Sequence, residues 1–224
     1  MRDLIAQERF EMAALEQLHS ARLLSRLAFT GGTMLRLCHG LDRYSVDLDF
    51  WAAGRLNAAR LFADLKRAMG GRWKIRDAAN KRFTLLVEIR SAEAPRALTI
   101  EVRKDAGAFA SEPAIAFSAH WPRQVLVTAV TLPDLMRRKA VALLDRKEIR
   151  DAFDMEHMLK RGIHVEETPD RARALLDKID TFTRTDYAVK LGSLLEPTTR
   201  KYYLSANFKI LAGALRERMS AERP

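Results

Sequence analysis

The chain of 224 residues has a single cysteine, Cys38, and this scarcity narrows the compartments in which it is expected to work. One cysteine cannot form a disulfide within the chain, so the sequence gives no sign of an oxidising compartment. Long apolar runs are also absent, and no segment has the uncharged length that crosses a bilayer. The first residues, MRDLIAQERFEMAAL, mix charged and apolar side chains, unlike the apolar centre of a signal peptide. We therefore expect a cytoplasmic protein with no membrane partner.

Histidine is scarce as well, with five residues in the whole chain. His157 stands near Asp154, but no second histidine lies at the spacing of a zinc site, so we expect no zinc. The sequence also offers no consistent Ser/His/Asp or Cys/His set. Nucleophilic catalysis by such sets is therefore not predicted.

Positive charge is abundant, and it is concentrated in one region. The net charge is +10, and residues 51–150 hold 20 Lys and Arg against 10 Asp and Glu, while the remaining residues hold 19 of each. A basic surplus favours a polyanionic partner, because each phosphate that is neutralised releases a counterion. RNA is the partner we expect, although the same charges are also compatible with a purely solubilising role.

The hydrophobic periodicity changes from helical to strand-like and back along the chain. Apolar residues recur at helical spacing in two early segments, 4–27 and 57–69. Runs rich in Val, Ile, Leu and Thr or in aromatics predict strands at 47–51, 73–76, 83–90, 97–103 and 124–130. Helical spacing then predicts helices at 133–145, 148–161, 168–180, 184–195 and 205–221. The pattern predicts an α+β fold, with a mixed sheet and flanking helices in residues 1–130 and a helical portion in residues 131–224.

Two aspartates interrupt the apolar run SVDLDFW. Because side chains alternate along a strand, Asp47 and Asp49 project to one side while Leu48 and Phe50 point to the core. Like charges so close repel each other, so a divalent cation between them would stabilise the pair. Mg²⁺ is the cation we expect, with Glu101 of LTIEVRK as a third ligand from a neighbouring strand. The alternative is a solvated sheet face on which Glu101 pairs with a basic residue.

A turn with two glycines precedes these aspartates. Gly31, Gly32 and Thr33 begin a short helix, and backbone N–H groups at such a helix start suit phosphate oxygens. A Gly-Gly pair alone is usually only a turn. The combination with Ser45 in the following loop and the two aspartates is much more specific.

The stretch GGTMLRLCHGLDRYSVDLDF resembles the signature of the nucleotidyltransferase superfamily in its AbiEii/AbiGii-type toxin branch. The resemblance covers residues 10 to about 160 and implies a nucleotidyltransferase-like mixed sheet. It implies metal-binding and catalytic roles for Asp47 and Asp49. It also implies nucleotide-binding roles for Gly31, Gly32, Thr33, Arg43, Ser45 and Lys139. The chain departs from the branch at Thr30, where a lysine is common, and at Val46, where an acidic residue is usual.

A second block, LPDLMRRKAVALLDRKEIRDAFDMEHML at 132–159, is similar to the helical motifs of the same branch. The resemblance implies that Lys139 binds the triphosphate and that Asp151 or Asp154 acts at the active site. Two alternatives rest on the residues themselves. Lys139 sits among apolar neighbours and would ordinarily snorkel outward, and Asp154 stands four residues after Arg150, the spacing of an ordinary helix ion pair.

Together these features predict a Mg²⁺-dependent nucleotidyltransferase toxin that uses an NTP and releases pyrophosphate. The resemblance implies a toxin of a type IV toxin–antitoxin or abortive-infection system, with a cognate antitoxin as a further partner. Relatives that extend the tRNA acceptor end make tRNA the acceptor we expect, which the basic surplus suits. Two alternatives stay open, nucleotide transfer onto a protein and a catalytically silent RNA-binding module.

Overall fold

The computed structural model describes residues 2–54 and 57–220. The chain forms two compact units, which divide between Thr131 and Leu132. Within the described residues, no helix combines the length and the apolar character that a membrane span requires.

The first unit is built on a mixed sheet of seven strands in the order β3-β4-β5-β2-β1-β7-β6. The strands are β1 (Leu27–Thr30), β2 (Asp47–Ala52), β3 (Lys74–Asn80), β4 (Thr84–Arg90), β5 (Leu98–Arg103), β6 (Ser111–Ala116) and β7 (Val125–Val130). Buried residues alternate with partly exposed ones along β4 and β5, as expected for strands with one face in the core. The mixed sheet with flanking helices confirms the predicted α+β class.

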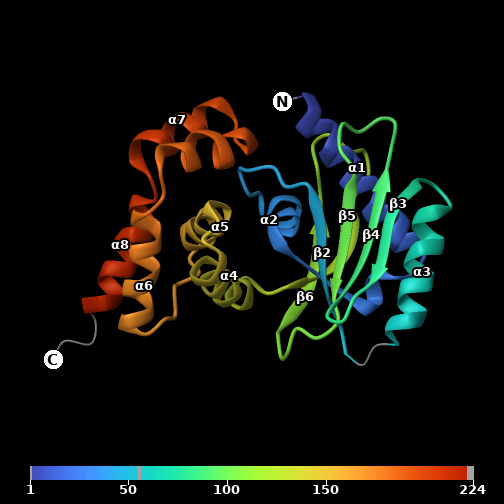
Figure 1. Cartoon of the computed structure of the whole chain (residues 1–224), viewed down its shortest axis with the longest axis horizontal. Helices are drawn as coiled ribbons and strands as arrows, with labels where there is room; N and C mark the ends of the chain where they lie inside the picture. Colours follow the sequence, from blue (N-terminus) through green and yellow to red (C-terminus); the bar gives the residue numbers. More distant parts are fainter. Residues whose placement is uncertain (1, 55–56, 221–224) are drawn as a thin grey trace. The chain divides into compact units, whose positions relative to one another are not determined.

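Three helices flank this sheet, α1 (Arg2–Ser20), α2 (Gly31–His39) and α3 (Ala58–Gly70). Helices α1 and α3 pack on each other, and α3 also packs on β3 and β4. Helix α2 packs on β1, β2 and β6, and Figure 1 shows it on the opposite side of the sheet from α3. The side chain of Asn57 caps α3 by accepting a hydrogen bond from the backbone N–H of Arg60 at 3.0 Å, as the sequence predicted.

Two strands of the sheet were not predicted. The expected helix over 4–27 ends early because Arg22 adopts a left-handed conformation with φ of 57°, and Leu24–Arg26 form a 3-10 turn that leads into β1. Strand β6 contains Pro113, which reads as a strand breaker. It is tolerated because β6 lies at the edge of the sheet, where one side of the strand needs no hydrogen-bonded neighbour.

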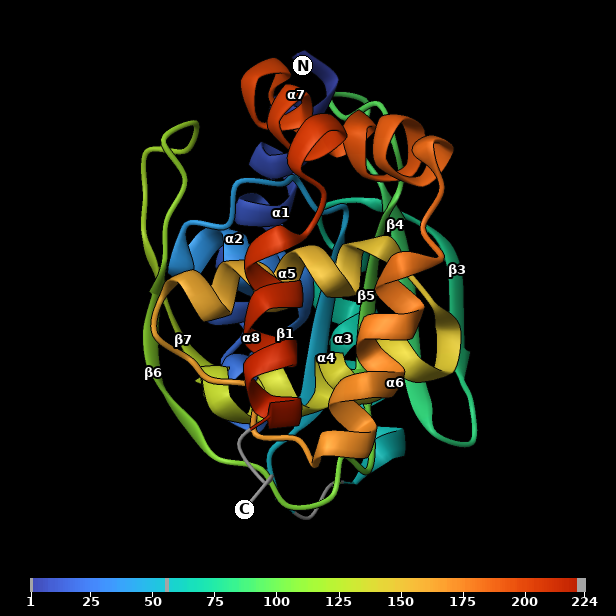
Figure 2. The ribbon, with the colours of Figure 1, turned by 90° about the vertical axis from the view of Figure 1, so that its left-hand side faces the viewer.

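Within the described residues, the regular elements of the second unit are all helices or helical turns, joined by loops. These are α4 (Leu132–Arg146), α5 (Ile149–Lys160), α6 (Pro169–Asp180), the π-helix η2 (Asp186–Leu191), the 3-10 turn η3 (Gly192–Leu194), α7 (Pro197–Ala206) and α8 (Lys209–Ser220). Helices α6 and α8 pack side by side (Figure 2). The predicted helices at 133–145, 148–161 and 168–180 are confirmed.

The prediction was wrong in detail for the last two helices. Residues 184–195 form no regular α-helix but a π-helical turn followed by a 3-10 turn, a difference that apolar spacing does not reveal. The predicted helix 205–221 is split between α7 and α8 at Asn207, whose φ of 51° interrupts the helical backbone. The ψ of Asn207, −147°, also departs from a helical backbone. Residue 221 of the predicted helix lies outside the described residues.

Candidate functional site

Strand β2 carries two carboxylates on one face. Leu48 and Phe50 are 0% and 1% exposed, whereas Asp47 and Asp49 are half-buried. Because side chains alternate, the two aspartates share the face opposite Leu48 and Phe50. The ring of Phe50 stacks on Phe29 with 5.1 Å between centroids. Packing on the apolar side of β2 therefore fixes the direction in which the carboxylates project.

The sheet register extends this acidic face across neighbouring strands. Asp49 pairs with Thr30 of the antiparallel strand β1 and with Glu101 of the parallel strand β5. Asp47 pairs with Thr99 in the same register. Directly paired residues share a face, and adjacent strands lie about 4.8 Å apart. The structure thus brings the three carboxylates predicted as metal ligands onto one face of the sheet.

Two of these carboxylates, those of Asp47 and Asp49, match the number of protein ligands that a magnesium ion commonly has. Among residues 2–54 and 57–220, no group of three His, Cys, Asp or Glu side chains has the arrangement of a metal site. Mg²⁺ commonly takes only one or two protein carboxylates and completes its shell with water and substrate phosphates. Asp47 and Asp49 meet that need, and Glu101 as a third ligand stays a prediction. Glu101 has no ion-pair partner within the described part of the chain, so the alternative pairing with a basic residue is not observed.

The glycine turn lies directly against this acidic face. Gly31 begins α2 with φ of 78°, a conformation that favours glycine. A Cβ atom built on Gly31 would lie 2.5 Å from Oδ2 of Asp49. The hydroxyl of Thr33 donates to the backbone oxygen of Asp47 at 2.5 Å and so ties the first turn of α2 to the start of β2. Backbone N–H groups at a helix N-terminus bind anions, and here they stand beside the proposed cation ligands.

The loop between α2 and β2 contributes the remaining predicted nucleotide-binding residues of this unit. Arg43 is 2% exposed, and its guanidinium lies against Gly32. Its Nη1 donates to the backbone oxygen of Tyr44 at 3.1 Å. Ser45 is half-buried in the same loop. Arg43 therefore holds the loop against the helix start, a supporting position that the sequence did not reveal.

The predicted residues of the second unit form one buried cluster. The Nζ atom of Lys139 lies 2.8 Å from Oδ1 of Asp151 and 2.7 Å from Oδ2 of Asp154. Arg146 adds two hydrogen bonds to Asp151, each of 2.9 Å. Helices α4 and α5 pack on each other and bring these groups together. Lys139 is turned inward, so the snorkelling alternative is wrong.

The positive charges of Lys139 and Arg146 keep the carboxyl group of Asp151 ionised in this cluster. Burial raises the pKa of its carboxyl, but the positive charge of Lys139 and the hydrogen bonds from Arg146 and Lys139 outweigh burial and lower the pKa below its ordinary value of 3.8. Asp154 is 0% exposed and paired with Lys139. A buried charge left without its partner is strongly destabilising, so the cluster is a structural unit whatever else it does.

Comparison with known proteins decides which class of protein carries this arrangement. A family model described as nucleotidyl transferase AbiEii toxin, type IV TA system, matches residues 13–207. The chain belongs to this AbiEii family. The match confirms the resemblance seen in the glycine turn and the two aspartates, and it makes the protein a nucleotidyltransferase of the toxin class. No curated protein sequence matches the AbiEii chain.

Solved structures share the fold of this AbiEii protein. JHP933 from Helicobacter pylori is 19% identical with a TM-score of 0.57, and the alignment covers 97% of this chain and 95% of JHP933. A second H. pylori structure, assigned as a nucleotidyltransferase, is 19% identical with a TM-score of 0.56, and the alignment covers 94% of this chain and 95% of that protein. At this level of identity the likeness concerns the fold alone.

The sequence did not predict a polar network that joins α1 to helix α2 of this AbiEii protein and to the loop that follows α2. Glu8 of α1 accepts a hydrogen bond from Nε of Arg36 and a second from the hydroxyl of Ser118 at 2.5 Å. The Arg36 guanidinium lies 3.6 Å from the ring centroid of Tyr44 and donates to the backbone oxygen of Leu41 at 3.1 Å. The network thus holds the loop that leads to Asp47 against α1.

Glu11 is a second missed residue of α1. It is 0% exposed, and neither carboxyl oxygen has a hydrogen-bond partner within the part of the chain that the structure describes. Burial, together with the negative charges of Glu8 and Asp47, raises the pKa of Glu11 well above its ordinary value, although Arg36 opposes this. The only signal in the sequence was a set of polar residues on an otherwise apolar helix face.

Proposed function

We propose that this AbiEii protein transfers a nucleotide from a Mg²⁺-bound NTP to the 3′ end of tRNA and releases pyrophosphate. The observation that carries the proposal is the placement of Asp47 and Asp49 on one face, directly beside the Gly31 turn. A cation site and a phosphate-binding helix start at the same place suit a metal-bound triphosphate.

In the proposed reaction, the acceptor hydroxyl oxygen forms a bond to the α-phosphorus of the NTP. The bond from the α-phosphorus to the pyrophosphate oxygen breaks, and the hydroxyl proton passes to solvent. Bound Mg²⁺ would lower the pKa of the hydroxyl and neutralise charge on the leaving pyrophosphate. Asp47 and Asp49 would hold the cation, while the N–H groups of Gly31 and Gly32 orient the triphosphate.

An RNA acceptor is supported by the charge distribution. The surplus of 20 basic over 10 acidic residues lies within residues 51–150. Lys74, Lys81 and Arg82 are exposed at the start of β3 and in the turn to β4, where they are free to reach a phosphate backbone. A protein acceptor would gain less from this charge.

The helical unit enters the proposal through Lys139, Asp151 and Asp154. We propose that Lys139 contacts the triphosphate and that one of the two aspartates acts in the transfer. Because type IV toxins are paired with antitoxins, a cognate antitoxin is a further expected partner.

A labelling experiment tests the function directly. The protein is incubated with Mg²⁺, total bacterial RNA, total protein and one α-labelled NTP at a time, and the labelled macromolecule is identified. Label at the tRNA 3′ end is the expected result. Label on protein would make protein the acceptor, and no label with any NTP, together with RNA binding, would favour the silent module.

A further inference from the structure

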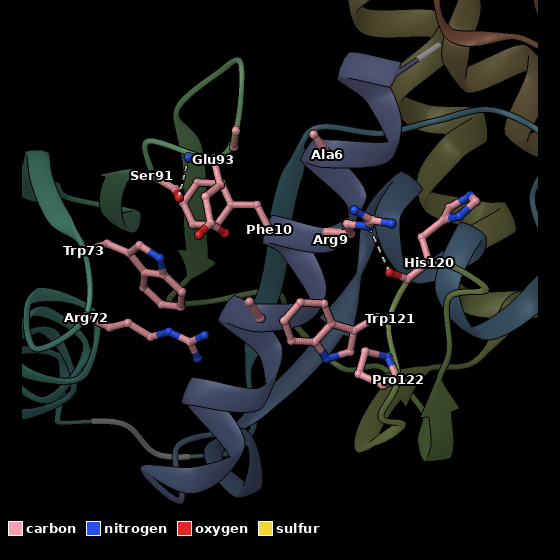
Figure 3. Close-up of a pocket in the computed structure, with 12 residues that line it drawn as sticks. Ala6, Arg9, Phe10, Arg72, Trp73, Ser91, Glu93, His120, Trp121 and Pro122 are labelled. Carbon is pink, nitrogen blue, oxygen red and sulfur yellow. Dashed lines mark hydrogen bonds between the residues drawn. The ribbon is translucent and has the colours of Figure 1, made fainter.

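A pocket separate from the acidic face lies between α1, the start of β3 and two loops. Its volume is about 370 Å³, and its lining includes Arg9, Phe10, Arg72, Trp73, Glu93 and Trp121. None of the residues proposed above to bind NTP or Mg²⁺ lines it. Figure 3 shows the indoles of Trp73 and Trp121 extending from opposite sides toward Phe10. The volume lies at the low end for small-ligand sites, which run from about 300 to 1,000 Å³.

The walls of this pocket are aromatic and held in place. The rings of Phe10 and Trp73 meet edge to face with 5.4 Å between centroids. The guanidinium of Arg72 lies 4.8 Å from the Trp73 ring. On the other side, the Nε of Arg9 donates to the backbone oxygen of His120 at 3.1 Å, which fixes the guanidinium beside the loop that contains Trp121 (Figure 3). Flat apolar surfaces are thus combined with two cations.

Trp121 also presents an unsatisfied donor. Its indole Nε1 is buried and has no hydrogen-bond partner among residues 2–54 and 57–220. Buried indole N–H groups usually find an acceptor. Because this atom is covered by the protein itself, it offers no hydrogen bond to a molecule in the pocket, and Trp121 contributes its ring alone.

We infer that this pocket binds one unpaired nucleobase of the acceptor RNA, an inference that rests on the proposed function for the nature of the acceptor. Single-stranded nucleic acids are held by aromatic side chains on which bases stack, next to basic groups that track the backbone. Trp73 and Trp121 provide the stacking surfaces, and Arg9 and Arg72 provide the charges. A base has the flat aromatic face and the neighbouring phosphate charge that this combination suits, whereas an aliphatic side chain has neither.

Intrinsic fluorescence tests the inference without Mg²⁺ or NTP. The chain has three tryptophans, and Trp51 is 8% exposed and packs edge-on against Phe109. A Trp51→Phe protein therefore reports on Trp73 and Trp121 alone. We expect a short single-stranded RNA to quench its emission saturably, and duplex RNA to quench it much less because its bases are already stacked. This measurement does not depend on whether alanine variants fold.

Affinity measurements by calorimetry provide the second arm. Trp73→Ala and Trp121→Ala should each weaken binding of the single strand about 10-fold or more, and phenylalanine at either position should restore part of it. Phe117→Ala is the matched control, because Phe117 is an aromatic residue that is 52% exposed and is not among the residues that line the pocket. Its affinity should match that of the wild type.

The outcomes separate the pocket from the active site. Absence of quenching, equal quenching by duplex RNA, wild-type affinity in both tryptophan variants, or quenching by peptides and not by RNA would each overturn the inference. Nucleotide transfer that persists while the pocket fails these tests would leave the proposed function standing. Saturable single-strand binding with no transfer would remove the proposed function and keep the pocket.

Discussion

Gly31 and Asp49 are so close that a side chain added at Gly31 would collide with the carboxylate of Asp49. A Cβ atom on Gly31 would lie 2.5 Å from Oδ2 of the aspartate. Since Asp49 is a proposed cation ligand and Gly31 begins the phosphate-binding turn, this contact couples the two halves of the proposed NTP site.

Gly31→Ala is expected to reduce nucleotide transfer roughly 100-fold, because small displacements of catalytic groups are costly. The control is Gly40→Ala. Gly40 has a similar positive φ of 65° but no atom within 4 Å of an added Cβ. Both variants should lose about 1–2 kcal/mol of folding free energy from the strained backbone, and Gly31→Ala should lose more because its added Cβ also collides with Asp49. Equal activity in the two variants, measured with labelled NTP, would show that the Gly31–Asp49 contact has no role in transfer.

Asp47→Ala and Asp49→Ala should each lower the transfer rate by at least roughly 100-fold and remove its Mg²⁺ dependence, because a cation ligand is lost. Melting temperatures of the two variants show whether they stay folded, so that a lost rate can be assigned to the site and not to unfolding. Glu88→Ala is the control. Glu88 pairs in register with Thr99, which pairs in turn with Asp47, so it lies on the same face two strands away. Wild-type rates in either aspartate variant would contradict the metal assignment.

Lys139→Ala should raise the KM for NTP or slow transfer, because a cation near the triphosphate is lost. It should also destabilise the protein by about 3–5 kcal/mol, since Asp151 and Asp154 are left buried without this partner. Kinetics are therefore measured at low temperature, where the variant stays folded. Arg146→Ala serves as the comparison, because Arg146 also pairs with Asp151 but its side chain is 59% exposed. Lost stability with unchanged kinetics would make Lys139 purely structural.

Binding of tRNA should weaken steeply with salt, with a log–log slope of several units, because each phosphate contact contributes roughly 0.7 to 0.9. Substituting Lys74, Lys81 or Arg82 should each flatten the slope by about that amount and spare NTP binding. Arg173→Ala is the control, since Arg173 is exposed on α6, outside the basic region. Binding that does not respond to salt, or no binding at low salt, would favour the protein acceptor.

Glu11→Gln is expected to stabilise the protein at neutral pH. The folded pKa of Glu11 is raised above its ordinary value of 4.5, so the folded state binds more protons than the unfolded state above about pH 4.5. Stability therefore falls as the pH rises from there toward the folded pKa. The amide removes this loss, so the gain in melting temperature should be larger at pH 8 than at pH 4.5. A gain that is independent of pH would show that Glu11 does not bind a proton on folding.

The sequence alone determined those features that depend on local chain geometry. Alternation along a strand set Asp47 and Asp49 on one side, and cap residues such as Asn57 set helix ends, because both follow from the backbone conformation of a few neighbouring residues. The signature around the glycine turn also identified the family, which the match over residues 13–207 confirms.

The tertiary structure decided everything that depends on which distant segments meet. Only the pairing of β2 with β5 aligns Glu101 with Asp49, and only the packing of α4 on α5 turns Lys139 toward two aspartates. Strand β6 is a strand despite Pro113 because it borders β7 at the sheet edge. Partners of this kind depend on packing and register between segments far apart in the chain, which local spacing does not encode.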